Sequence, residues 1–115
     1  MVRVRRVYEK PDPSDGRRVL VDRLWPRGLS RDSAALDDWL REIAPSDDLR
    51  RWYGHEPSRF AEFSVRYRAE LADPAHVDAV ERLREHAQAG PLTLLTATRD
   101  LAGAHTAVLV ELIDS

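Results

Sequence analysis

Two clusters of chemically versatile side chains each follow a short apolar segment of this 115-residue chain. Their members that could bind a ligand or transfer a proton are Asp22, Arg23, Trp25, Arg27 and Gly28 in the first cluster, and Thr96, Thr98, Arg99, Asp100 and His105 in the second. Arginine grips carboxylate and phosphate groups with paired hydrogen bonds, and a helix that begins nearby adds free amide groups. These residue types predict a site for a small anionic ligand that carries phosphate or carboxylate.

Asp22 and His105 are the candidate catalytic residues, because each could hold or move a proton. The sequence places His105 at the start of the last helix, where the helix dipole lowers its pKa and keeps the imidazole neutral. A structural role is the alternative for both: His105 could cap its own helix, and Asp22 could pair with Arg23, Arg27 or Arg99. The other members of the two clusters are candidate ligand-binding residues.

The pattern of apolar residues predicts the elements that position these clusters. Strands are expected at residues 2–8, as an edge strand, at 18–24, as a central strand, and at 92–96. Helices are expected at 31–43, 46–53 and 57–71, then from Asp73-Pro74 to the stop at Gly90-Pro91, and finally through the stretch that begins near His105.

We therefore predict an α/β fold, a small single-domain layered structure over residues 1–115 with a short, mostly parallel sheet of about three strands covered by about five helices. If the second and third strands are parallel, both clusters lie at the carboxyl edge of the sheet, where open α/β sheets bind ligands. The short connection between the first two strands permits either a hairpin or a tight crossover.

Composition removes several classes of function. The chain has no cysteine, which excludes disulfides, thiol nucleophiles and Cys-ligated zinc. It has no apolar run of bilayer length and no secretory leader, so we expect a cytoplasmic protein without membrane contact. His76 and His86 do not share a helix face, so we predict no metal and no cofactor.

Net charge leaves two alternative functions open. The total is −2, but residues 1–28 are basic and could receive an anion. A nucleic-acid-binding transcriptional regulator would need a recognition helix among the three predicted between residues 31 and 71, whose exposed faces mix both signs. A partner-binding accessory protein could dock an acidic surface on the basic segment. Whether the protein catalyses a reaction is left open.

The string Val-Leu-Val-Asp-Arg-Leu-Trp-Pro-Arg-Gly at residues 19–28 resembles the YeaO-like family, a bacterial family defined as a domain of unknown function. The resemblance extends from about residue 7 to residue 113 and implies a compact α/β fold, a cytoplasmic location and no established reaction. This chain departs from the family pattern after the last strand. Thr96 stands where the family has an aromatic residue, Thr98 where it has alanine and Arg99 where it has lysine, whereas Asp100 is kept.

Overall fold

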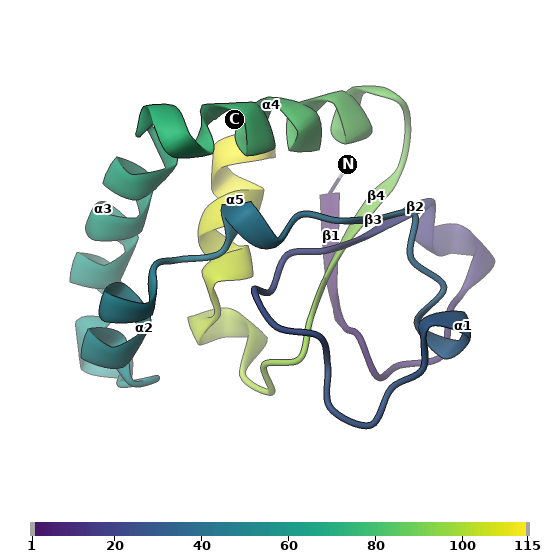
Figure 1. Ribbon diagram of the computed structural model, residues 1–115, viewed down its shortest axis with the longest axis horizontal. Helices are drawn as coiled ribbons and strands as arrows, with labels where there is room; N and C mark the ends of the chain where they lie inside the picture. Colours follow the sequence, from purple (N-terminus) through teal and green to yellow (C-terminus); the bar gives the residue numbers. More distant parts are fainter. Residues whose placement is uncertain (1, 115) are drawn as a thin grey trace.

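A four-stranded sheet forms the centre of this protein (Figure 1), whose computed structural model describes residues 2–114. The strands are β1 (Val2–Arg6), β2 (Arg17–Leu20), β3 (Asp38–Trp39) and β4 (Leu92–Thr96), and their spatial order is β1-β4-β2-β3. All three neighbouring pairs are parallel. The predicted α/β class is confirmed, with four strands instead of about three. β1 and β2 lie on either side of β4 and both run parallel to it. The connection from β1 to β2 is therefore a crossover and not a hairpin.

Five α-helices lie within residues 2–114, and local capping sets where they begin and end. They are α1 (Arg31–Ala34), α2 (Asp47–Tyr53), α3 (Phe60–Leu71), α4 (Pro74–Gln88) and α5 (His105–Asp114), with short 3-10 turns at Pro13–Asp15, Arg41–Ile43, Pro57–Arg59 and Leu101–Gly103. The side chains of Ser30, Ser46 and Asp73 accept hydrogen bonds from first-turn amides of α1, α2 and α4. Gly54 ends α2 with a left-handed backbone, φ 52°.

The predicted helix at 31–43 is wrong, because only its first four residues are α-helical and the range ends in a separate 3-10 turn at Arg41–Ile43. Ala35 turns the chain with φ 50°, and the amides of Asp37 and Leu40 then donate to carbonyl groups of β2 at 2.8 and 2.9 Å. Pairing with the open edge of β2 thus replaces the helical hydrogen bonds. The apolar residues whose spacing suggested a helix lie instead in an extended segment. Leu40 is buried in the larger apolar cluster, and Trp39 packs against the smaller one.

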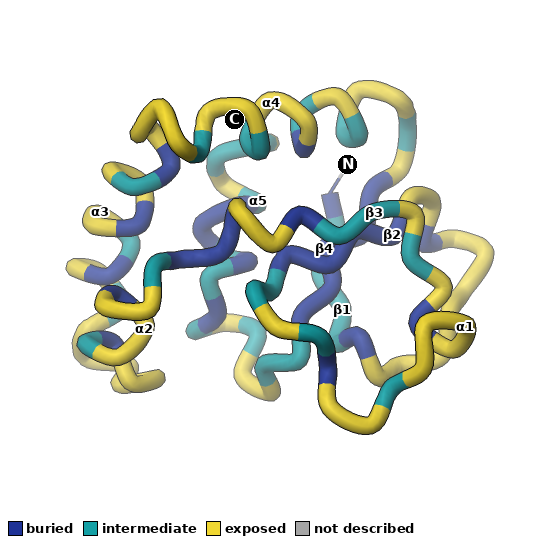
Figure 2. Tube along the Cα trace, in the orientation of Figure 1, coloured by how far each residue is buried: buried dark blue, intermediate teal, exposed yellow. Residues whose placement is uncertain are grey.

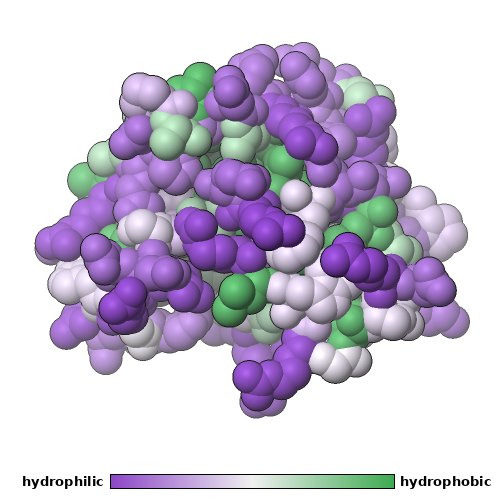
Figure 3. All heavy atoms as spheres, viewed as in Figure 1, coloured by the Kyte–Doolittle hydropathy of each residue, from purple (hydrophilic) through white to green (hydrophobic). Residues whose placement is uncertain are grey.

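The main core lies on the face of the sheet that α3, α4 and α5 cover (Figure 2). Phe63 and Tyr67 of α3 and Leu83 of α4 are fully buried there against the strands. A smaller cluster around Leu20 and Leu95 lies on the opposite face, under the connections between strands. The outer faces of the helices are exposed (Figure 2). Figure 3 shows that mainly hydrophilic side chains cover the face of the molecule that is turned to the viewer in Figure 1. No helix within residues 2–114 is long and apolar enough to span a bilayer.

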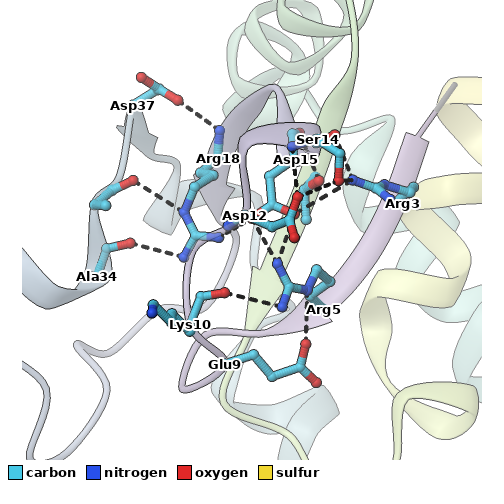
Figure 4. Close-up of polar contacts among 12 residues, drawn as sticks. Arg3, Arg5, Glu9, Lys10, Asp12, Ser14, Asp15, Arg18, Ala34 and Asp37 are labelled. Carbon is cyan, nitrogen blue, oxygen red and sulfur yellow. Dashed lines mark hydrogen bonds and ion pairs between the residues drawn. The ribbon is translucent and has the colours of Figure 1, made fainter.

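A buried carboxylate joins β1, β2 and their crossover (Figure 4). Asp15 is 1% exposed and pairs with Arg3 at 3.5 Å, with Arg5 at 2.8 Å and with the buried Arg18. Burial by itself would raise the pKa of Asp15, but hydrogen bonds from the Asp12 amide and from two of the arginines hold it below its ordinary value. Three arginines of the basic N-terminal segment are therefore engaged with Asp15.

Candidate functional site

A cavity of about 500 Å³ opens at the carboxyl ends of β2 and β4, beside the first residues of α5. The predicted site residues that line it are Asp22, Arg23, Trp25, Arg27, Thr98 and His105. The predicted site residues that do not line it are Gly28, Thr96, Arg99 and Asp100. Members of both sequence clusters therefore meet at one cavity, because parallel strands deliver both to the same edge of the sheet.

Asp22 fastens the chain that follows β2 to the chain that follows β4. Its Oδ1 accepts a hydrogen bond from Thr96 Oγ1 at 2.7 Å, and its Oδ2 accepts one from the Ala97 amide at 2.8 Å. Thr96 is fully buried and also accepts from the Thr98 amide. Among residues 2–114 no arginine forms an ion pair with Asp22; the titratable side chain beside it is His105, whose Nε2 lies 3.5 Å from Oδ1. Thr96 thus orients Asp22 and does not itself face the cavity.

His105 is the first residue of α5 and lies against the end of β2. Its Nε2 is 2.9 Å from the carbonyl oxygen of Val21, and the ring edge packs on Tyr67. Burial lowers the pKa of His105, while the nearby carboxylate of Asp22 and the bond to Val21 oppose that shift. The positive charge of Arg50 adds to the lowering, so the neutral imidazole is favoured.

Arg23 and Arg27 bring positive charge to the cavity from the loop after β2. Nη2 of Arg23 donates to the carbonyl oxygens of Ala44 and Pro45, both at 3.3 Å, which fixes the direction of the guanidinium group. The Nε atom of Arg23 is buried without a hydrogen-bond partner among the described residues. Tyr8 supports the loop, because its hydroxyl donates to the Arg27 carbonyl at 2.9 Å. Neither guanidinium forms an ion pair with any residue from 2 to 114.

The wall opposite this loop comes from α2 and the turn after it. Arg50, Arg51, Tyr53 and His55 all line the cavity. Arg50 also pairs with the exposed Asp47 at 3.0 Å. The Tyr53 hydroxyl donates to the Gly103 carbonyl at 2.7 Å, which holds the turn before α5. Sequence reasoning did not predict the arginines or the tyrosine here. It had no signal for them, since tertiary packing alone brings α2 to the sheet edge.

Four other residues of the predicted site have different surroundings. Trp25 forms a rigid wall: its Nε1 donates to the Leu29 carbonyl, Arg31 covers its ring and Trp39 packs edge-on against it. Gly28 takes the left-handed conformation, φ 77°, that turns the loop back toward α1. The side chains of Arg99 and Asp100 are exposed to solvent beyond the cavity.

The cavity is suited to binding an anion. Four arginines and two histidines line it against a single aspartate. His105 and Thr106 are the first two residues of α5, where helix amides have no intrahelical acceptor. Within residues 2–114 no group of three or more His, Asp and Glu side chains could hold a metal ion. Fold and cavity together define a small parallel α/β protein with an arginine-lined pocket at the carboxyl edge of its sheet.

The chain belongs to a family described as the inactive DUF488-N3 subclade, which matches residues 1–115. It is 49% identical over 113 residues to the uncharacterized protein Rv3073c of Mycobacterium tuberculosis H37Rv, covering 98% of this chain and 93% of that one. It is 41% identical over 114 residues to the uncharacterized protein YeaO of Escherichia coli K12, covering 99% and 97%. The resemblance to the YeaO-like family is therefore confirmed. No solved structure matches the chain.

Proposed function

We propose that this protein binds a small anion bearing phosphate or carboxylate in the arginine-lined pocket, and that it does so without catalysing a reaction. The observation that carries the proposal is that Arg23 and Arg27 face the pocket without an ion-pair partner in the described part of the chain. Both line the pocket, and neither has a carboxylate partner among residues 2–114. A concave site that gathers unpaired guanidinium groups attracts oxyanions and can hold them bidentately.

The N-terminus of α5 supports the same ligand chemistry. This helix has ten residues, and Gly103, Ala104 and His105 at its start all line the pocket. The Ala104 amide already donates to the Leu101 carbonyl, but the amides of His105 and Thr106 and the positive end of the helix dipole favour negative charge at that point. An oxyanion placed between Arg23 and the start of α5 would meet donors on two sides.

The geometry supports binding ahead of catalysis. Both carboxylate oxygens of Asp22 accept hydrogen bonds from the chain itself, and Nε2 of His105 lies against the Val21 carbonyl. Asp22 is therefore not left as an unengaged base, and within residues 2–114 no hydrogen bond joins His105 to a hydroxyl nucleophile. The description of the family as an inactive subclade agrees with a protein that retains a pocket without chemistry.

A nucleic-acid-binding regulator and a partner-binding accessory protein have less support. Arginines on the exposed faces of α2 and α3 pair with acidic neighbours: Arg51 with Asp48, and Arg66 with Glu62. Such faces lack the sustained positive charge that tracks a phosphate backbone. No surface feature within residues 2–114 specifies a protein partner.

Calorimetric titration with phosphate, sulfate and citrate tests the proposal, using Arg27→Ala and Arg99→Ala as a matched pair. Both arginines are exposed and lie in loops at the same edge of the sheet, but only Arg27 lines the pocket. We expect Arg27→Ala to raise the dissociation constant about tenfold, the value of one charge-assisted hydrogen bond, and Arg99→Ala to leave it unchanged. Equal effects of the two substitutions, or no binding of any anion, would contradict the proposal.

A further inference from the structure

The two ring nitrogens of His105 have different surroundings. Nε2 lies 2.9 Å from the Val21 carbonyl oxygen, which can only accept a hydrogen bond, so Nε2 carries the hydrogen in the neutral ring. Nδ1 has no hydrogen-bond partner among residues 2–114, while the ring lines the anion pocket. Nδ1 is therefore the nitrogen left for a ligand, and in the neutral ring it presents a lone pair.

A lone pair at Nδ1 is unfavourable for an oxyanion, whose own oxygens are also acceptors. Protonation would turn Nδ1 into a donor and would add a positive charge to the pocket. The neighbours that face His105 come from several elements: Asp22 after β2 favours the charged ring, Arg50 of α2 and His55 after it oppose it, and Tyr67 of α3 packs on the ring edge. An anion in the pocket would shift this balance toward the charged imidazole.

We infer that the pocket takes up its oxyanion together with one proton, which binds at Nδ1 of His105. This inference rests on the proposed function and adds a mode of regulation, because binding strengthens as the surroundings become more acidic. The exchange balances simply: the empty pocket holds a neutral imidazole, and the occupied pocket holds an imidazolium whose Nε2–H contacts Val21 and whose Nδ1–H contacts the anion. Asp22, 3.5 Å from Nε2, stabilises that charge from the other side.

The size of the effect follows from proton linkage. Burial holds the pKa of His105 below 6.5 in the empty protein, and a bound anion raises it. Between those two pKa values each unit of acidification tightens binding by about tenfold, because one proton is taken up per anion. Above both values the affinity no longer changes with pH.

Sulfate is the appropriate probe, because its charge does not change near neutral pH. Its affinity is measured by calorimetry at about pH 8 and about pH 6, a range that brackets histidine titration, for the wild type, for His105→Gln and for His76→Gln, a control on α4 outside the pocket. Glutamine at 105 keeps a side-chain donor for the Val21 carbonyl but cannot take up a proton. We expect binding to tighten by about tenfold at the lower pH in the wild type and in His76→Gln, and to lose this dependence in His105→Gln.

Nitrogen-15 spectra of the histidine rings in the wild type, with and without sulfate, keep the test decisive even if a variant fails to fold. A charged His105 ring in the complex, at a pH where the free protein has a neutral ring, supports the inference. Sulfate binding with no pH dependence, or a dependence retained in His105→Gln, overturns the inference but leaves the proposed function intact. Absence of sulfate binding at both pH values overturns both.

Discussion

Oδ2 of Asp22 lies 2.8 Å from the amide nitrogen of Ala97, and this hydrogen bond joins the two loops that form the pocket. Oδ1 of the same carboxylate accepts from Thr96, so both oxygens bridge from the end of β2 to the end of β4. Asp22, which its residue type makes a candidate base, therefore has a structural role: it fixes the distance between the loop after β2 and the loop after β4.

Replacing Asp22 with alanine should therefore loosen the pocket as well as destabilise the fold. The substitution removes two hydrogen bonds and leaves the buried Thr96 hydroxyl to donate over the longer distance of 3.3 Å to Thr98 Oγ1, which costs about 2 to 3 kcal/mol. Urea unfolding followed by circular dichroism measures this loss. A variant as stable as the wild type would show that the bridge between the loops contributes little.

Asp15→Ala should be far more damaging. The change leaves Arg18, which is 5% exposed, together with Arg3 and Arg5 around an empty space, and an unpaired buried charge costs about 3 to 5 kcal/mol. Arg3→Ala is the matched control, because the Arg3 side chain is 41% exposed and its ion pair contributes less than about 1 kcal/mol. Similar unfolding midpoints for the two variants would rule out Asp15 as the centre of this network.

Ala35→Gly distinguishes the observed structure from the helix expected at residues 31–43. Ala35 has φ 50°, a conformation that glycine adopts at lower cost, so the substitution should stabilise the protein by about 0.5 to 1 kcal/mol. Inside a continuous helix the same substitution would destabilise by about 1 kcal/mol. The sign of the change in thermal midpoint decides between the two structures, and a lowered midpoint would contradict the turn at Ala35.

Stability should fall as pH is lowered through the range in which histidine titrates. Burial lowers the folded-state pKa of His105 below its ordinary value of 6.5, so in mild acid the unfolded chain takes up a proton that the folded protein does not. The contribution of His105 is complete above pH 6.5 and is lost between that value and its lowered pKa. Chemical unfolding across this range should show a smaller pH dependence in His105→Gln than in the wild type; identical profiles would exclude His105 as the source.

Much of this architecture is predictable because it depends on local chemistry. Ser30, Asp73 and Gly54 mark helix ends through capping and backbone preference, which act over a few residues. The composition of the apolar run at β4 is enough to predict a buried strand. The meeting of the two polar clusters also follows from the sequence, since it requires only that β2 and β4 be parallel.

What the sequence could not indicate depends on tertiary packing. The spacing of Leu36, Trp39 and Leu40 fits a helix, yet pairing with the edge of β2 satisfies the same backbone in an extended form. Arg50 reaches the pocket only because α2 packs against α3 and is tied through Tyr53 to the turn before α5. Arg99 is close in sequence to a strand end but is exposed to solvent. The direction of a loop side chain is set by the path of the loop, which apolar periodicity does not encode.

Mapping of amide chemical shifts during a sulfate titration is the most direct test of the anion pocket. The account predicts that the resonances that move will be those of Ala97, Thr98, Gly103, Ala104 and His105, with no change around Asp15, where arginines are already paired. The same titration of Arg27→Ala should need a higher sulfate concentration for equal shifts. Shifts centred on the Asp15 network or spread evenly over the exposed arginines, with Ala97 and His105 unmoved, would contradict a specific anion site at the carboxyl edge of the sheet.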